Sequence, residues 1–196
     1  LEDLLGRRQN RLDTDKIKKF VKQKVVLITG AAGSIGGELT SRISDLNPRH
    51  ILLLDSSENA LYNLKLRLQK KNNLKNFNFF CTNVRNKDET EKIFIKFKPE
   101  VIFHAAALKH VSICEDNISE AIRTNILATN NLSNMAEKYN SECFILVSTD
   151  KAVEPSSVMG ASKKIAEMII QSKDKFTKGK SRFISVRFGN VLGSTG

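Results

Sequence analysis

Paired cysteines, clustered histidines and long apolar runs are all missing from this chain of 196 residues. Its three cysteines, Cys81, Cys114 and Cys143, form no CxxC pair, which argues against a disulfide framework or a zinc site and suits a reducing compartment. No apolar run reaches the length of a membrane span, and no signal peptide is visible. We therefore expect a cytoplasmic protein without a metal site. Because the chain starts at Leu1 and not at Met, we also expect it to be a fragment.

Acidic residues are few compared with basic ones: 21 Asp and Glu stand against 32 Lys and Arg, a formal net charge of +11. The basic residues cluster at Lys16–Lys24 and Lys173–Arg182. Neither cluster alternates with aromatic residues, as a binder of single-stranded nucleic acid would, so we expect no nucleic-acid partner. A lysine-rich solvated surface is the simplest interpretation. An acidic small substrate such as a nucleotide sugar, or an anionic membrane surface, would also suit this charge.

The stretch from Val25 to Leu39 carries a strong signal for cofactor binding. Five apolar or β-branched residues, Val25–Thr29, predict a buried strand. Glycines follow at G-x-x-G-x-x-G spacing, and apolar residues then recur at helical spacing. This pattern predicts the first half of a dinucleotide-binding βαβ unit, with the pyrophosphate at the helix N-terminus. The alternative is a sharp turn without a ligand. The predicted cofactor-binding residues here are Gly30, Ala32, Gly33, Ser34, Ile35 and Gly36.

Strand and helix patterns alternate from Val25 onward. The predicted strands are Val25–Thr29, His50–Asp55, Phe77–Cys81, Val101–His104, Phe144–Ser148 and Arg182–Phe188. The predicted helices are Ser34–Leu46, Glu58–Lys70, Asp88–Phe97, Glu115–Tyr139 and Val158–Lys173. Six strands joined by five crossovers predict an α/β fold, a Rossmann-like doubly wound parallel sheet. Residues 1–24 form a lead-in that we expect to pack against the sheet through Ile17, Phe20 and Val21, and residues 25–196 form the dinucleotide-binding domain.

Three further strand ends carry candidate cofactor residues. Asp55 ends the second strand about 20 residues after Gly36, where a carboxylate accepts hydrogen bonds from ribose hydroxyls; capping of the next helix is the alternative. No arginine follows it to receive a 2′-phosphate, which favours NAD over NADP. The third strand is followed by a polar and an apolar residue that can flank an adenine, and the fourth by three small residues. The candidates are Asp55, Asn83, Val84, Ala105, Ala106 and Ala107.

Taken with the glycine turn, the residues Ser148–Lys151 (STDK) make the chain resemble the extended short-chain dehydrogenase/reductase family. Within it, the chain resembles the polysaccharide-biosynthesis nucleotide-sugar 4,6-dehydratases of the UDP-N-acetylglucosamine 4,6-dehydratase type, in their long membrane-anchored subgroup. The matching stretches are LEDLLGR (1–7), ITGAAGSIGGEL (28–39), LLLDSSE (52–58), FHAAALKHV (103–111), EAIRTNILAT (120–129), VSTDKAVEPSSVMGASKKIAE (147–167) and VRFGNVLGSTG (186–196).

The resemblance also implies what lies beyond this chain. LEDLLGR is similar to the segment that joins the soluble domain of the long members to their transmembrane helices. We therefore expect that those helices, and the family's C-terminal substrate-binding part, are absent here. The full-length protein would then sit at the cytoplasmic face of the inner membrane, and we expect a homo-oligomer.

The activity that the resemblance implies is an NAD-dependent dehydration of a UDP-sugar in three steps. Hydride leaves sugar C4 and thereby acidifies the C5 proton; a base then removes that proton while an acid helps the C6 hydroxyl leave as water; the hydride finally returns to C6. The resemblance assigns Asp150 as the acid, held protonated, and Lys151 as the base, made neutral by burial and neighbouring charge. Thr149 would hydrogen-bond the C4 oxygen. The spacing alone would equally fit an exposed turn.

Several other positions match the family's site. Met159 stands where most of the superfamily has a tyrosine that exchanges a proton, and the long dehydratases share this methionine; a packing role is the alternative. Lys163 lies on the same helix face as Met159 and would bind the nicotinamide ribose. Asn125 would shape the cofactor site from within the fourth helix. Lys109 and Asn190 are the predicted substrate contacts.

Two other functions stay open at this point. A nucleotide-sugar 4-epimerase also forms a 4-ketone, but it has no need of the Asp150–Lys151 pair and would favour tyrosine at position 159. A non-catalytic dinucleotide-binding domain would fit Met159 and the absence of a C-terminal part. The exact hexose and the stereochemistry at C5 of the product are also left open.

Overall fold

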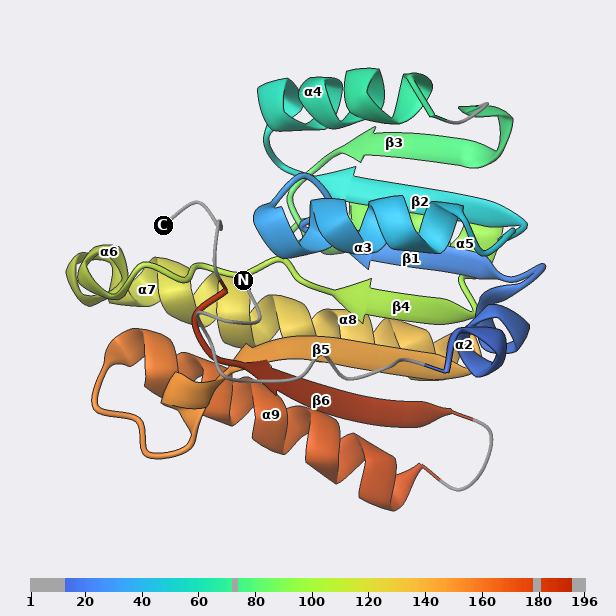
Figure 1. Cartoon of the computed structure of the whole chain (residues 1–196). Coiled ribbons are helices and arrows are strands. Elements are labelled where there is room, and N and C mark those ends of the chain that lie inside the picture. Colours follow the sequence, from blue (N-terminus) through green and yellow to red (C-terminus); the bar gives the residue numbers. More distant parts are fainter. Residues whose placement is uncertain (1–12, 72–73, 178–180, 192–196) are drawn as a thin grey trace.

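The structure is a computed structural model that describes residues 13–71, 74–177 and 181–191. One six-stranded sheet runs through it, with the strands in the order β3-β2-β1-β4-β5-β6 (Figure 1). Every neighbouring pair is parallel, which confirms the predicted doubly wound sheet. All six predicted strands are present, and β5 is longer than predicted by one residue at each end. The strands are β1 (Val25–Thr29), β2 (His50–Asp55), β3 (Phe77–Cys81), β4 (Val101–His104), β5 (Cys143–Thr149) and β6 (Arg182–Phe188).

The strand order creates a topological switch point between β1 and β4. From β1 the chain steps outward through β2 to β3, then returns to β4 and steps the other way to β6. The connections after β1 and β4 therefore leave the sheet in opposite directions, and a crevice opens at the carboxyl ends of these strands. Thr29 at the end of β1 pairs in register with Leu54 of β2 and His104 of β4, so these strand ends form one level edge.

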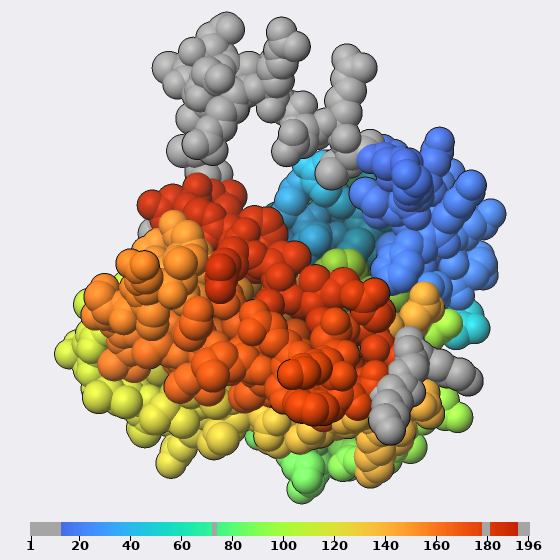
Figure 2. Space-filling view, turned by 90° about the horizontal axis from the view of Figure 1, so that it is seen from below, coloured from blue at the N-terminus to red at the C-terminus, as the bar shows by residue number. Residues whose placement is uncertain are grey.

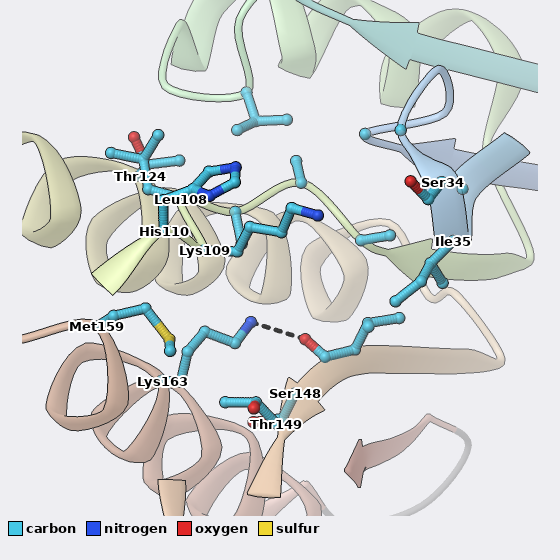
Figure 3. A pocket seen from close by; sticks show the side chains of 18 of the residues that line it. Ser34, Ile35, Leu108, Lys109, His110, Thr124, Ser148, Thr149, Met159 and Lys163 are labelled. Atoms are coloured by element: carbon cyan, nitrogen blue, oxygen red, sulfur yellow. Dashed lines mark hydrogen bonds between the residues drawn. The ribbon is translucent and has the colours of Figure 1, made fainter. Parts of the chain in front are cut away.

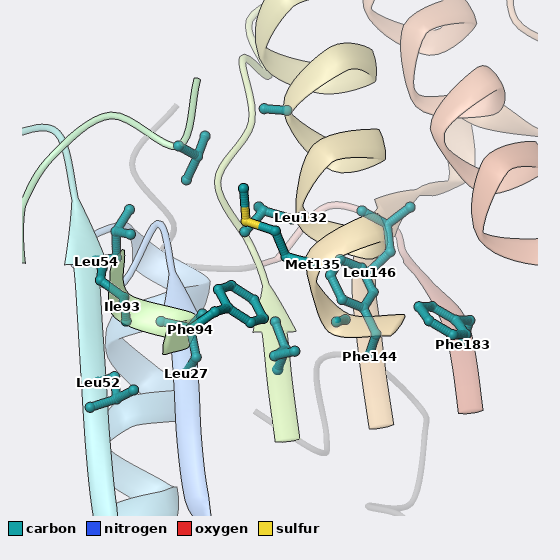
Figure 4. Close-up of a cluster of buried hydrophobic side chains, with 14 of the residues drawn as sticks. Leu27, Leu52, Leu54, Ile93, Phe94, Leu132, Met135, Phe144, Leu146 and Phe183 are labelled. Atoms are coloured by element: carbon teal, nitrogen blue, oxygen red, sulfur yellow. The ribbon is translucent and has the colours of Figure 1, made fainter. Parts of the chain in front are cut away.

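Helices cover both faces of the sheet, and each face has its own apolar core. One face is covered by α3 (Ser34–Ser44) and α4 (Glu58–Gln69), and the other by α5 (Lys87–Phe97), α8 (Ala128–Lys138) and α9 (Val158–Phe176). Alternate strand residues serve the two cores: Val26 and Ile28 face α3, while Leu27 faces the other side, where Phe94 and Phe144 lie (Figure 4). Burial on both faces explains why the strands read as continuous apolar runs.

The prediction of a single helix at Glu115–Tyr139 is wrong. The segment contains α6 (Val111–Asp116), α7 (Ile118–Ala121), a π-helical segment (Ile122–Leu127) and then α8. Asn117 takes φ −133° and ψ 56°, which ends α6. Within the wider turn of the π segment, the side chain of Asn125 bonds the backbone of Leu108. Helical periodicity does not reveal such a contact, because it depends on a residue outside the helix.

The N-terminal lead-in packs less closely than predicted. Its helix α2 (Thr14–Val21) is capped by Asp13, and Val21 is buried in the core beside α3. Ile17 and Phe20 stay 38% and 36% exposed, so the expectation that they pack against the sheet is wrong. Val21, at the C-terminal end of α2, is its buried core residue, and the dark blue N-terminal segment lies at the edge of the molecule (Figure 2). The segment 1–7 lies outside the described residues, and within the described parts no helix is long and apolar enough to cross a bilayer.

Gly36→Ala is expected to destabilise the fold by about 1–3 kcal/mol. A Cβ at residue 36 would overlap the backbone carbonyl of Gly30, which has no room to move aside. Gly37→Ala, one residue further along α3, is the matched control, because its Cβ would meet only the flexible end of Arg67. Higher helix propensity should make that control neutral or more stable, by up to about 1 kcal/mol. Urea unfolding measures the free energy of unfolding of both variants, and equal stability of the two would contradict the packing argument.

Candidate active site

A cleft of about 610 Å³ lies along the carboxyl edge of the sheet. Figure 3 shows Leu108, Lys109 and His110 on one side of it, and Met159 and Lys163 on the other. Three predicted site residues, Ala32, Asn125 and Asp150, do not line the cleft. The predicted residues that do line it are Gly30, Gly33, Ser34, Ile35, Gly36, Asp55, Asn83, Val84, Ala105, Ala106, Ala107, Lys109, Thr149, Lys151, Met159, Lys163 and Asn190.

The glycine turn fits against the end of β4 because it carries no side chain there. Gly30 has a φ of +63°, and a Cβ on it would lie 2.6 Å from the backbone nitrogen of Ala106. α3 begins at Gly33 without a side-chain cap, whereas Ser57 and Ser157 cap α4 and α9 with their hydroxyl groups. The N-terminus of α3 therefore lies on the cleft with its positive dipole end, as a pyrophosphate site requires.

Asp55 joins the glycine turn to the loop after β2. Its Oδ2 accepts a hydrogen bond from the Ala32 backbone N–H (2.9 Å), and its Oδ1 accepts one from the Ser57 N–H (3.0 Å). The alternative that Asp55 caps α4 is wrong, because the Ser57 hydroxyl does so by accepting from the Ala60 N–H. Ala32 is thus a partner of Asp55 and not part of the cleft wall. The carboxylate keeps further lone pairs for hydroxyl groups in the cleft.

Arg85, which the sequence interpretation missed, organises the end of the cleft beyond β3. Asn83 Oδ1 accepts hydrogen bonds from both the backbone N–H (3.0 Å) and the Nε (3.2 Å) of Arg85. The Arg85 guanidinium also pairs with Glu120 on α7, and both side chains line the cleft. Arg85 follows the predicted Asn83–Val84 pair directly, which is a usable signal. Its partner lies 35 residues further along the chain, and no local pattern indicates it.

Asn125 supports the cleft wall from behind. Its Oδ1 accepts from the Leu108 N–H (2.9 Å), and its Nδ2 donates to the Leu108 carbonyl (3.0 Å) and to Ser162 Oγ (2.9 Å). The side chain is 1% exposed and does not line the cleft. Asn125 therefore shapes the site from behind by holding the loop after β4 against α9, and its contact with the cofactor stays a prediction.

A buried amine lies at the centre of the cleft floor. Lys163 is 5% exposed, and its Nζ donates to the Val147 carbonyl of β5 at 2.6 Å (Figure 3). Burial lowers the pKa of Lys163 to about 8, and the charge of Glu167 offsets part of this shift. Met159 is 4% exposed, packs with Cys114 and also lines the cleft. Met159 is therefore both a packing residue and a wall of the site.

The residues after β5 form an open hydrogen-bonded cluster. Thr149 Oγ1 donates to Asp150 Oδ1 (2.9 Å), and Lys151 donates to the same oxygen through its backbone N–H (2.9 Å). Lys151 Nζ lies 3.4 Å from that oxygen and 3.2 Å from the Oδ1 of Asn190, in the segment directly after β6. The turn after β5 thus brings a hydroxyl, a carboxylate and an amine together at one end of the cleft, close to the segment that follows β6.

Two expectations about this cluster are wrong. Asp150 was expected to be protonated, but the hydrogen bond from Thr149, aided by Lys151, holds the pKa of its carboxyl below the usual value. Lys151 was expected to be buried, but its side chain is 44% exposed, and that of Asp150 is 57% exposed. Both side chains are open to water because the turn lies at the rim of the sheet, and for Asp150 the neighbouring donors favour the ionised carboxylate.

His104, at the end of β4, is the buried polar centre beneath the cleft. Its Nδ1 lies 2.7 Å from Thr29 Oγ1 and its Nε2 lies 2.9 Å from Thr129 Oγ1 of α8. Burial, with a smaller contribution from the charge of Lys163, lowers the pKa of His104 to about 3. The imidazole is therefore neutral at physiological pH and connects β1, β4 and α8 below the glycine turn.

The cleft also has lining residues that were not predicted. Most of them directly adjoin a predicted residue at a strand end, so strand-end position is the signal that could have found them. They are Leu54, Ser56, Thr82, Arg85, Leu108, His110, Glu120, Thr124, Val147, Ser148, Phe188, Gly189 and Val191.

These features together define the class of protein. An all-parallel sheet with its switch point between β1 and β4, an uncapped glycine turn and a buried lysine on α9 define a Rossmann-type protein of the extended short-chain dehydrogenase/reductase class. The family follows from comparison with known sequences. The chain belongs to the polysaccharide biosynthesis protein family, whose profile matches residues 26–196.

Individual relatives agree with this assignment. The capsular polysaccharide biosynthesis protein CapD of Staphylococcus aureus is 45% identical over all of this chain, which spans 33% of that protein. A UDP-glucose 4-epimerase of Rickettsia canadensis is 34% identical over 88% of this chain and 50% of its own length. The chain therefore spans a third to a half of the length of these relatives.

Solved structures show the same fold. Pen from Bacillus thuringiensis has a TM-score of 0.84 and 34% identity, over 90% of this chain and 55% of its own. The Bordetella bronchiseptica enzyme WbmG, solved in complex with NAD, has a TM-score of 0.71 and 21% identity, over 88% of this chain and 55% of its own. At that identity the likeness to WbmG shows the fold alone.

Acid is expected to destabilise the fold through His104. The pKa of His104 is about 3 in the folded protein, and its ordinary value is 6.5. Between these two pH values the unfolded chain therefore binds more protons than the folded protein. The stability that neutral His104 contributes is fully present above pH 6.5 and is lost as the pH falls toward 3, at up to about 1.4 kcal/mol per pH unit. Between about pH 7 and pH 5, His104→Gln should therefore lose about 2 kcal/mol less than the wild type. Urea unfolding measures the difference, and His110→Gln, at an exposed histidine, is the control that should follow the wild type. Equal losses in all three proteins would contradict the role of His104.

Proposed function

We propose that this chain carries the cofactor site and the acid/base residues of an NAD-dependent nucleotide-sugar 4,6-dehydratase. It would convert UDP-N-acetylglucosamine to a UDP-4-keto-6-deoxy sugar for polysaccharide or glycan biosynthesis. The observation that carries the proposal is the cluster after β5, where Thr149, Asp150 and Lys151 are hydrogen-bonded at one end of the cleft. Membership of the polysaccharide biosynthesis protein family supports it.

The residues of the cleft fit NAD. The uncapped N-terminus of α3 suits a pyrophosphate, and Asp55 at the end of β2 suits ribose hydroxyls while repelling a 2′-phosphate. Lys163 lies where a cation can hold the second ribose, and WbmG, which shares the fold, was solved with NAD. Bound NAD would accept hydride from sugar C4 and return it to C6.

Thr149 and Asp150 offer a path for the proton of the C4 hydroxyl. Met159 has no proton to exchange, so another group must accept this one. Thr149 Oγ1 takes it from the sugar as its own proton passes over 2.9 Å to Asp150 Oδ1. The lowered pKa of Asp150 is an advantage here, because the carboxyl starts as the ionised acceptor. Asp150 then holds the proton that the next step needs.

The elimination uses that proton together with Lys151. Lys151, in its amine form, removes the C5 proton, and Asp150 gives its proton to the C6 hydroxyl, which leaves as water. As hydride reaches C6, the Lys151 ammonium returns its proton to C5. Both side chains end in their starting states, and one water is lost per turnover. Asn190 accepts from Lys151 Nζ at 3.2 Å and can orient the amine.

The second candidate is a nucleotide-sugar 4-epimerase, favoured by the 34% identity to the Rickettsia canadensis UDP-glucose 4-epimerase. An epimerase needs no acid/base pair for a C5–C6 elimination, which is why we rank it below the dehydratase. The homo-oligomer and the attachment of the full-length protein to a membrane stay predictions.

Mass spectrometry of the sugar after incubation of the full-length protein with NAD and UDP-N-acetylglucosamine tests the proposal. Loss of one water is the expected result. An unchanged mass with inverted configuration at C4 would establish the epimerase instead, and recovery of the unaltered sugar would leave a binding protein without this activity.

Two variants test the assigned steps separately. Lys151→Ala should abolish water loss but still oxidise C4, so reduced nicotinamide accumulates to an equilibrium level of at most about one equivalent per site, because the hydride can return to C4 but not reach C6. Asp150→Asn should show neither water loss nor reduced nicotinamide, because the C4 proton then has no acceptor. Both should bind NAD as tightly as the wild type. Lys175→Ala, at an exposed lysine far along α9, is the control that should keep full turnover. Normal turnover in either site variant would refute its assignment.

A further inference from the structure

A chain of buried hydrogen bonds runs beneath the cleft from β1 to α8. Thr29 Oγ1 lies 2.7 Å from His104 Nδ1, and His104 Nε2 lies 2.9 Å from Thr129 Oγ1. Thr129 Oγ1 in turn donates to the Asn125 carbonyl at 2.7 Å. None of these four residues is more than 1% exposed, so water has no access to replace a missing partner.

The direction of these bonds follows from the number of hydrogens available. Thr129 has one hydroxyl hydrogen, and it points at the Asn125 carbonyl. Thr129 Oγ1 must therefore accept from His104, which places the imidazole hydrogen on Nε2. A neutral imidazole has only one N–H, so Nδ1 is the acceptor and Thr29 donates to it. Burial keeps the ring neutral by lowering the pKa of His104 to about 3.

We propose that His104, in its Nε2–H tautomer, is the positioning residue that holds the glycine turn in its cofactor-binding geometry. This inference rests on the proposed function only for the identity of the cofactor. His104 acts through Thr29, the residue directly before the turn. It does not itself line the cleft, and it is distinct from the residues assigned to the reaction above.

The contacts around Thr29 show what the imidazole holds in place. The Thr29 carbonyl accepts from the Ala105 N–H at 3.0 Å, and Gly30 lies so close to Ala106 that a Cβ would come within 2.6 Å of its nitrogen. The side chain of Thr29, at the end of β1, also bonds His104, the last residue of β4. Three contacts thus join the start of the turn to the end of β4, and the hydrogen bond to His104 is the one that a side-chain substitution can remove.

The same imidazole is linked to the opposite wall of the cleft. From Thr129 the network continues to Asn125, whose side chain bonds both backbone groups of Leu108 and the hydroxyl of Ser162. In the opposite tautomer Nε2 carries no hydrogen and would need a hydrogen bond from the Thr129 hydroxyl. Thr129 could donate to it only by giving up its hydrogen bond to the Asn125 carbonyl. One tautomer is therefore compatible with the whole network.

Nitrogen NMR of the imidazoles tests the tautomer without any cofactor. The chain has three histidines, so His104→Gln identifies the signals of His104 by their disappearance. At neutral pH we expect a pyrrole-type Nε2 and a pyridine-type Nδ1 for His104. A protonated Nδ1, either as the other tautomer or as an imidazolium, would overturn the proposal.

The positioning role is tested by the affinity for NAD, measured by calorimetry. Thr29→Val removes only the hydroxyl, and we expect NAD to bind about three- to tenfold more weakly. Thr29→Ser keeps the hydroxyl and should retain wild-type affinity. Thr90→Val is the matched control: Thr90 is equally buried, and its hydroxyl donates to the Asn86 carbonyl at 2.7 Å outside the network, so its loss should leave NAD affinity unchanged.

Each result of the affinity measurement has one interpretation. Equal affinities of Thr29→Val and the wild type would overturn the positioning role. Equal weakening in Thr29→Ser and Thr29→Val would also overturn it, since a side chain that keeps the hydroxyl would then fail to keep the affinity. Should Thr29→Val fail to fold, Thr29→Ala takes its place in the same comparison, and wild-type affinity of Thr29→Ala would overturn the positioning role. Failure of the wild type to bind NAD would refute the proposed function, while the NMR result would still stand.

Discussion

The close backbone contact between the glycine turn and the end of β4 is the constraint on which the rest of the structure depends. Gly30 has no room for a Cβ beside Ala106, and Gly36 has none beside Gly30. This contact holds the turn at the switch point of the sheet, so α3 opens onto the cleft. It also buries the polar ends of β1 and β4, which is why Thr29 and His104 need partners and find them in each other.

The floor of the cleft and the cluster after β5 differ in how much water reaches them. Lys163 is buried and donates to a backbone carbonyl, which suits a group that holds a ligand in one orientation. Asp150 and Lys151 are about half exposed, which suits groups that exchange protons with a substrate entering from outside. Met159 forms part of the cleft wall without offering a proton, so the proposed proton path runs through Thr149.

Most of the fold was predictable, because its elements depend on local patterns. Strands such as Ile51–Leu54 are buried on both faces, so they appear in the sequence as unbroken apolar runs. The break at Asn117 was not predictable, since the apolar spacing continues through it while the Asn117 backbone leaves the helical region. The exposure of Phe20 escaped prediction for a related reason: amphipathic spacing shows which face is apolar and not whether another surface covers it.

By itself the sequence determined the strands, the glycine turn, the acid at the end of β2 and the short motif after β5, because each depends on the chemistry of neighbouring residues. Only the tertiary structure decided that the pKa of Asp150 is lowered, that Arg85 pairs with Glu120 and that His104 lies between the hydroxyls of Thr29 and Thr129. Protonation states and hydrogen-bond partners depend on groups within about 3 Å. Folding brings these groups together from positions far apart in the chain, and no local pattern records which of them will meet.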